Sequence, residues 1–463
     1  MKKILIAILI LSAISCENLV DDINQNPNEP VDVPAELLLK GMMLADITVQ
    51  VSHMQRISAM WSGQYKGLTL LYGSLYTYNI TSEEANDTWE AIYVGVLNQG
   101  RVIRESLPDD GLMQGITKVL EAHVVGTATS IFGSVPYSEV VSDIANPAFD
   151  TQSSVYQQLQ SILDEAIINL ESVPATVSNS QDIFYGGTPE KWIEAAYTLK
   201  ARYYLQTKNY AAAYAAAQNG ISSGDNSMKF YPPGVVGNGD SNLLYSFAEA
   251  RGGYMTSIGT YFESLLDPEN ADSRNNAKTN EEARANFFYY DGTDGAGEIG
   301  VGAQTTPQPL ILFEENLLIL AEAGARTEDF ATGLTHLNEL RAYLNSGASF
   351  NMANTGGTLL YEAYDEADFE NGGIENSDGI DKDRALLREI IEERYVSGYG
   401  QFIPFNDARR LRKEDVDIAI PIPFNTPEIT QYPERFIVSQ DELNANSNAP
   451  DDPGIFSKTE VNQ

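Results

Sequence analysis

Apolar residues recur with a helical period through much of the chain. In residues 188–221 they fall at Trp192, Leu199 and Tyr203, among others, at the spacing of one face of an α-helix. The segment 207–209 interrupts this period, and an alanine-rich helix follows. A large aromatic start with small residues at close-packed positions is typical of tetratricopeptide hairpins. The segment therefore predicts two helices folded back on each other.

The start of this hairpin carries helix-initiating residues, and its pattern returns later in the chain. Thr188 is expected to accept a hydrogen bond from an early amide, and Pro189 sits where a missing N–H does no harm. Around Tyr210 and again around Phe330, a small-residue helix end is followed by Thr, a charged residue, Asn or Asp, an aromatic ring and Ala. Since the copies lie 120 residues apart, we expect helical hairpins separated by long loops rather than a tandem array.

Other stretches share the helical pattern, and three do not. Helices are expected in 34–61, 81–107, 111–132, 154–171, 310–344 and 384–397. A capping box at 81–84 is expected to open the second of these. Irregular excursions are expected at 62–80, 222–309 and 346–383, where glycine and polar residues break the period. The last fifty residues, which hold many prolines, are expected to wrap the surface.

The N-terminus has the pattern of a secretory signal. Two lysines precede a short apolar run and small residues that end at Cys16, and the run is far shorter than the ~20 residues that span a bilayer. We therefore predict a lipoprotein signal peptide over 1–15. Cys16 resembles the acylated cysteine of bacterial lipoproteins, the alternative being an ordinary thiol in an uncleaved leader. A flexible tether over 16–33 and a single helical domain over 34–463 follow.

Composition narrows the classes of function. A chain of 463 residues that is 43% hydrophobic can bury a large core, and its formal charge of −36 disfavours nucleic acid and anionic lipid as partners. Since Cys16 is the only cysteine, no disulfide can form within one molecule. The three histidines are far apart in sequence, and no metal site or cofactor is expected. Structural calcium is left open at 291–298 and 376–383, where oxygen-bearing residues lie near glycines without a complete calcium loop.

Several short motifs follow one another in a recognisable order. They lie at 22–24, 26–28, 131–137, 320–323, 337–341, 389–394, 407–410, 433–436 and 442–446. Taken with Cys16, their order and spacing over almost the whole chain resemble the SusD/RagB family of outer-membrane nutrient-binding lipoproteins, in its SusD-like branch. No single motif is specific.

The resemblance implies a mostly α fold. About four tetratricopeptide-like hairpins would form an α-solenoid scaffold with long loop excursions and few short strands. It also implies a lipid-anchored protein, exposed at the cell surface on the outer membrane, that acts as a lid on a SusC-type TonB-dependent transporter. Ligands of the family are mainly oligosaccharides, and in one branch peptides. The family is not enzymatic; the rival interpretation is a helical glycoside hydrolase, which needs two carboxylates at a fixed separation.

Two segments carry the residue types that bind sugars, namely flat rings for the apolar face of a pyranose and polar groups for its hydroxyls. The first set is Trp61, Gln64, Tyr65, Tyr72, Tyr76, Tyr78 and Asn79. Glycines among them favour a loop, although each ring can equally be a core residue. The second set is Phe287, Phe288, Tyr289 and Tyr290. Four consecutive rings cannot all face one way, so at least one or two are expected to be buried. No catalytic residue is proposed.

Overall fold

The computed structural model describes residues 33–140, 144–234, 240–271, 273–350 and 355–463. The predicted signal peptide, Cys16 and the tether up to residue 32 lie outside these ranges. None of the helices described is both long enough and apolar enough to cross a membrane.

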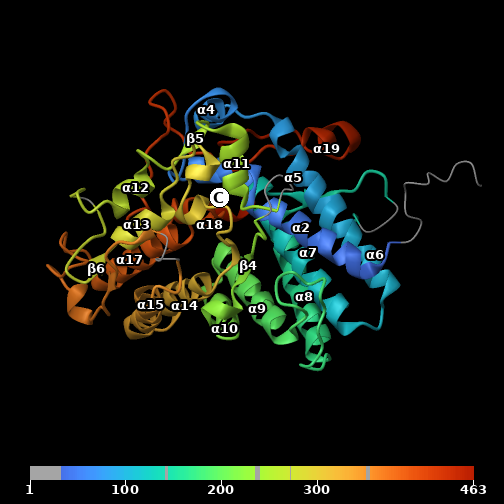
Figure 1. The fold of residues 1–463 in the computed structure, drawn as a ribbon, viewed down its shortest axis with the longest axis horizontal. Helices are drawn as coiled ribbons and strands as arrows, with labels where there is room; N and C mark the ends of the chain where they lie inside the picture. Colours follow the sequence, from blue (N-terminus) through green and yellow to red (C-terminus); the bar gives the residue numbers. More distant parts are fainter. Residues whose placement is uncertain (1–32, 141–143, 235–239, 272, 351–354) are drawn as a thin grey trace, which may run out of the picture.

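Helices account for most of the described structure (Figure 1). The longer ones are α2 (Ala35–Val51), α3 (His53–Trp61), α6 (Gln99–Ser106), α7 (Gly111–Phe132), α8 (Gln152–Glu171), α9 (Pro189–Gln206), α10 (Tyr210–Ala217), α11 (Leu243–Arg251), α14 (Phe313–Thr327), α15 (Phe330–Asn345), α17 (Lys382–Ser397) and α18 (Ile403–Leu411). Shorter ones are α4 (Leu70–Tyr76), α5 (Asn86–Glu90), α12 (Tyr261–Leu266), α13 (Glu282–Phe288) and α19 (Gln440–Ala445). A π-helical stretch, η2 (Ala91–Asn98), joins α5 to α6.

The strands are short and pair only in twos. Each pair is antiparallel and joins segments separated in the sequence. The pairs are β1 (Lys66–Gly67) with β5 (Met255–Thr256), β2 (Val135–Pro136) with β3 (Phe149–Asp150), β4 (Met228–Phe230) with β7 (Gln308–Ile311), and β6 (Thr279–Asn280) with β8 (Leu360–Tyr361). Two of the pairs, β1 with β5 and β6 with β8, join one excursion to another, and β4 with β7 brings together the two ends of the excursion 222–309.

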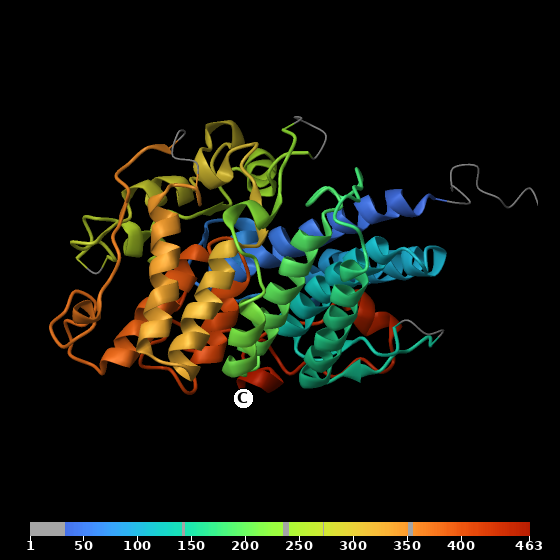
Figure 2. The same cartoon turned by 90° about the horizontal axis from the view of Figure 1, so that it is seen from below.

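Four helical hairpins form the scaffold: α7 with α8, α9 with α10, α14 with α15, and α17 with α18. Consecutive hairpins pack through α8 against α9, α10 against α14, and α14 against α17. Figure 2 shows α7 to α10 and then α14 and α15 standing side by side in one row, with the yellow excursion between β4 and β7 lying across one end. This arrangement confirms the predicted mostly-α class of tetratricopeptide-like hairpins.

The repeated motif seen in the sequence begins the second helix of two hairpins. Asn209 Oδ1 accepts a hydrogen bond from the Ala212 amide (3.3 Å), and Asp329 Oδ1 accepts one from the Thr332 amide (2.8 Å). Each side chain satisfies a backbone donor that the helix itself leaves unpaired. The two motifs are therefore equivalent helix caps.

Motifs that are distant in sequence meet in a buried ionic network at the α14, α17 and α18 interface. Glu322 on α14 forms two hydrogen bonds with Arg410 on α18 (2.7 and 2.9 Å), and Arg410 also binds Asp407 (3.0 Å). Arg394 on α17 binds Asp407 (2.8 Å) and lies 3.7 Å from Glu322. All four residues are buried, so the charges are balanced within the network rather than by solvent.

A second group of motifs fixes the C-terminal segment. The Phe436 amide donates to the Ile131 carbonyl (2.8 Å), while Arg409 donates to the carbonyls of Ser130 (2.8 Å) and Glu434 (2.9 Å). Helix α7 ends here at Gly133, whose φ of 84° and ψ of −113° suit glycine alone. The C-terminal chain therefore packs into the molecule at this point and does not merely cover its surface.

Three local expectations were wrong. The helix expected over 34–61 breaks at Ser52, whose ψ of −136° is not helical and whose hydroxyl bonds the Thr48 carbonyl, a pairing that bends helices. Thr188 does not cap α9, because its hydroxyl donates to the Tyr185 carbonyl (2.8 Å). At 81–84 no capping box forms, since the Glu84 carboxylate lies 2.6 Å from His53 Nε2 instead.

Candidate functional site

The first predicted set, from Trp61 to Asn79, lies largely in the core. Trp61 is 1% exposed, and Gln64 and Tyr65 are 0% exposed. Tyr72 and Tyr78 are also buried, and Tyr76 is half-buried. Asn79 alone is exposed, and its amide donates to Ser74 Oγ (2.9 Å). These rings therefore do not form the exposed platform expected from the sequence.

Specific partners hold these buried groups. The Trp61 ring stacks on Phe436 at 4.5 Å between centroids, and its Nε1–H donates to the Leu75 carbonyl (2.9 Å). Gln64 donates to the Tyr395 carbonyl (3.3 Å) and accepts from the Gly400 amide (3.3 Å). The segment 62–80 is a packed connection that contains α4, not a free loop.

The second predicted set divides, as expected for four consecutive rings. Tyr290 is 0% exposed and its hydroxyl donates to the Leu244 carbonyl (3.2 Å). Phe287 and Phe288 end α13 and are half-buried, whereas Tyr289 is 41% exposed. Helix α13 stops because Tyr289 adopts an extended backbone, which turns Tyr290 into the core and leaves the two phenylalanines facing a cavity.

This cavity, which we name the aromatic pocket, has a volume of about 370 Å³, within the range of small-molecule sites. It is lined by Lys229, Tyr231, Arg284, Phe287, Phe288, Val301, Ala303, Thr305, Thr306, Pro307, Pro309, Leu312, Glu314, Ala348, Ser349, Phe350, Ser397, Tyr399 and Gln401. The two long excursions meet the ends of α14 and α17 around it. The pocket thus lies where the loops join the scaffold.

Aromatic rings form a continuous series along the pocket. Phe350 lies 5.9 Å from Phe287, Phe287 lies 5.4 Å from Phe288, and Phe288 lies 4.7 Å from Tyr399, measured between ring centroids. Tyr231 also lines the pocket and is 60% exposed. This combination of enclosed rings and one accessible ring suits an apolar ligand face.

The polar groups of the pocket include one arginine whose charge is already balanced. Arg284 is 1% exposed; it pairs with Glu393, lies 3.3 Å from Glu281 and donates to Ser397 Oγ (3.0 Å). Burial alone would lower its pKa, but the charges of Glu393 and Glu281 raise it above the ordinary value. Arg284 thus remains charged and fixes the base of α13. The hydroxyls of Thr305 and Thr306 and the side-chain amide of Gln401 also belong to the polar lining.

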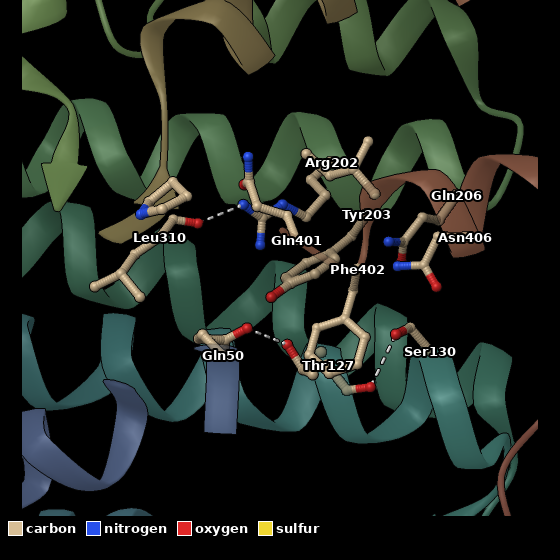
Figure 3. Close-up of a pocket in the computed structure, with 13 residues that line it drawn as sticks. Gln50, Thr127, Ser130, Arg202, Tyr203, Gln206, Leu310, Gln401, Phe402 and Asn406 are labelled. Carbon is tan, nitrogen blue, oxygen red and sulfur yellow. Dashed lines mark hydrogen bonds between the residues drawn. The ribbon is translucent and has the colours of Figure 1, made fainter. Parts of the chain in front are cut away.

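Two further cavities are less suited to a sugar. One of about 230 Å³ adjoins Tyr289 and the other side of Phe288, next to Glu263. Figure 3 shows the other, of about 30 Å³, which has room for about one water molecule. There Thr127 donates to Gln50 Oε1 (3.0 Å). The cavity beside Glu263 is also lined by rings, those of Phe262, Phe288 and Tyr289, so the aromatic pocket is preferred for its larger volume and its longer series of rings.

No group of three or more His, Cys, Asp or Glu side chains within the described ranges is placed to hold a metal ion. At 291–298 Asp294 accepts from the Ala296 amide (3.0 Å), and at 376–383 Asp378 pairs with Arg388 (2.8 Å). These carboxylates already have protein partners. A structural calcium at either segment remains a prediction.

Sequence reasoning missed Tyr231, Glu314, Phe350 and Tyr399. They come from four separate regions of the chain, and no local pattern marks any of them as lining the same cavity. Two signals were available: Tyr231 precedes two prolines inside an irregular excursion, and Glu314 stands within an apolar run.

Comparison with known proteins gives one family and several similar folds. The sequence model of the SusD-like family, described as starch-binding and associating with the outer membrane, matches residues 27–400. A comparison with curated proteins gives no match.

Solved structures with the same fold are distant in sequence. A chitin-binding SusD homolog from Flavobacterium johnsoniae is 17% identical, with a TM-score of 0.67 over 92% of this chain and 98% of that one. A SusD/RagB family protein from Bacteroides thetaiotaomicron is also 17% identical, with a TM-score of 0.66 over 90% and 95%. A SusD homolog from Bacteroides uniformis is 15% identical, with a TM-score of 0.67 over 93% and 100%. The resemblance inferred from the motifs is confirmed.

Proposed function

We propose that this chain, which belongs to the SusD-like family described as starch-binding and associating with the outer membrane, captures an oligosaccharide in the aromatic pocket. It then passes the ligand intact to a SusC-type TonB-dependent transporter. The observation that carries the proposal is the ring series from Phe350 to Tyr399, with the accessible ring of Tyr231 in the same cavity. One neighbour of similar fold binds chitin, which is consistent with this chemistry.

Binding without cleavage is part of the proposal. Among the described residues that line the aromatic pocket, Glu314 is the one carboxylic acid. The common mechanisms of glycoside hydrolysis use a pair of carboxylates flanking the scissile bond. This composition supports a binding protein over the hydrolase alternative.

Titration calorimetry of the mature chain with starch and chitin oligosaccharides, together with peptides of mixed sequence, tests the function. We expect heat of binding with at least one oligosaccharide and chromatographically unchanged ligand after prolonged incubation. Binding of peptides alone would move the protein to the peptide-binding branch. Shortened glycans would establish a hydrolase.

Replacement of Tyr231 by alanine is expected to weaken oligosaccharide binding by at least about 1 kcal/mol, because it removes an accessible ring face from the pocket. Since this side chain is 60% exposed, folding should be unaffected. Tyr289→Ala is the matched control: its ring is 41% exposed but adjoins the neighbouring cavity. Equal affinities for both variants and the wild-type chain would exclude this pocket as the site.

The lipid anchor is a separate part of the proposal, and it rests on the sequence around Cys16. We expect Cys16→Ala to abolish retention in the outer-membrane fraction, because acylation would have no thiol, while the released protein keeps its ligand affinity. The readout is immunoblotting of membrane and soluble fractions from cells. Membrane recovery equal to that of the wild type would show that something else holds the protein there.

A further inference from the structure

One polar group in the aromatic pocket has an unused hydrogen-bonding position. Glu314 is 3% exposed and lines the pocket. Its Oε1 accepts a hydrogen bond from the Ser349 hydroxyl (2.7 Å), whereas its Oε2 has no partner within the described part of the chain. An unpartnered buried oxygen is costly, and in native structures it calls for an explanation such as a ligand.

Glu315, the next residue in the chain, shows how a buried carboxylate is usually satisfied. Glu315 is equally buried, and both of its carboxylate oxygens accept from Arg202 (2.6 and 2.7 Å). Glu314 is joined by no salt bridge to Lys229 or Arg284, the two cations that line the pocket in the described structure. Arg284 is already engaged by Glu281 and Glu393.

The position of Glu314 favours a carboxylate. It is the second residue of α14, a helix of 15 residues, and the partial positive charge of a helix N-terminus stabilises a negative group there. A carboxylate accepts hydrogen bonds but donates none. Glu314 therefore supplies an acceptor, unpartnered among the described residues, to the wall of the pocket that also carries the rings of Phe350, Phe287 and Phe288.

We propose that Glu314 makes the aromatic pocket selective for neutral sugars, by accepting a hydrogen bond from a ligand hydroxyl at Oε2 and by repelling the carboxylate of uronic acid residues. This inference rests on the proposed function, since it concerns the same pocket. Glu314 is thereby a specificity-determining residue, while the rings supply the apolar contact. The hydroxyl replaces the missing partner, and an acidic sugar would place two like charges together in a site of low dielectric.

The test compares neutral and acidic probes of matched length. Maltohexaose and chitohexaose are titrated against hexagalacturonate in 0.5 M salt, which screens the general negative charge of the surface. The wild-type chain is expected to bind one of the neutral hexasaccharides at least about tenfold more tightly than hexagalacturonate, since a hydrogen bond to a charged group is among the stronger ones. Preference for hexagalacturonate would overturn the inference and assign ligand choice to Lys229.

The variant Glu314→Gln keeps an acceptor for Ser349 and removes the charge. We expect it to lower the affinity for the neutral sugar about tenfold. The ratio of the affinity for neutral sugar to the affinity for acidic sugar should therefore fall. Glu263→Gln, in the neighbouring cavity, removes the same charge and should leave the ratio unchanged. Ser349→Ala tests a merely structural role, because it releases Oε1 without altering Oε2; the ratio should persist in that variant.

The outcomes separate this inference from the function on which it rests. If neither neutral nor acidic sugar binds the wild-type chain, the proposed function fails and the inference fails with it. If neutral sugars bind and Glu314→Gln leaves the ratio unchanged, only the inference is overturned. If Glu314→Gln does not fold, as judged by thermal denaturation, two other measurements test the inference. One is the ratio of neutral to acidic sugar affinity in the wild-type chain. The other is the same ratio in Glu314→Asp, which keeps the charge but moves its oxygens away from the ligand.

Discussion

Replacement of Trp61 by alanine is expected to lower the free energy of unfolding by about 3–5 kcal/mol, the usual range for truncating a buried large aromatic side chain. Trp61 is 1% exposed and stacks on Phe436 at 4.5 Å. Its removal leaves a cavity and takes from the Leu75 carbonyl the hydrogen bond of the indole N–H, although the Tyr78 amide still donates to that carbonyl. Urea denaturation followed by circular dichroism measures the effect.

The control for this variant is Tyr231→Ala. Because Tyr231 is mostly exposed, its removal should change stability by no more than about 0.5 kcal/mol. A Trp61 variant as stable as the wild type, with weakened sugar binding, would restore Trp61 as a binding residue and contradict the core assignment.

Replacement of Glu322 by glutamine is expected to cost about 3–5 kcal/mol of stability, because it leaves buried arginine charge without compensation. Glu322 is 0% exposed and holds Arg410 by two hydrogen bonds, with Arg326 and Arg394 nearby. The control, Glu339→Gln on α15, affects an exposed pair with His336 that is worth at most about 1 kcal/mol. Equal denaturation midpoints for the two variants would refute the claim that Glu322 stabilises the fold by balancing buried arginine charge.

The carboxylate of Glu322 should also make the stability of the protein depend on pH. Burial alone would raise the pKa of Glu322, but the charges of Arg410, Arg326 and Arg394 lower it to about 2, below the ordinary 4.5. Its contribution is therefore complete above about pH 4.5 and is lost as the pH falls towards 2. The stability difference between the wild type and Glu322→Gln should shrink over this interval. A difference that stays constant from pH 7 to pH 3 would contradict this.

The scaffold could be predicted from sequence because its signals are local. Helical periodicity gave α7 its observed bounds, Gly111–Phe132, and placed both helices of the hairpin from α9 to α10. The repeated motif around Asn209 and Asp329 proved to be a helix cap in both copies. Caps and apolar faces depend on neighbours within a few residues, so one sequence suffices to find them.

The segment 61–79 was misread because its glycines were taken as signs of an open loop. A Cβ at Gly67 would lie 2.0 Å from the Tyr72 carbonyl oxygen, and Gly63 has a φ of 76°. These glycines permit a tight, buried connection rather than a free one. Sequence cannot distinguish the two uses of glycine when the contacting atoms come from elsewhere in the chain.

The site could be predicted only in part for a related reason. Phe287 and Phe288 could be singled out as candidates because they form a local cluster, and they line the aromatic pocket, whereas their role in binding stays a prediction. Tyr231, Glu314 and Phe350 join them only through the folded arrangement of the excursions around α14. A cavity formed by separated segments leaves no periodic signature, so its lining becomes visible only in three dimensions.

A crystal structure of the protein soaked with the oligosaccharide that binds in calorimetry tests the central claim most directly. The account predicts electron density for at least one sugar ring in the aromatic pocket, against Tyr231 or the ring series from Phe350 to Tyr399, with a hydroxyl within hydrogen-bond distance of Glu314 Oε2. Sugar density elsewhere on the molecule, with the aromatic pocket containing only solvent, would contradict it.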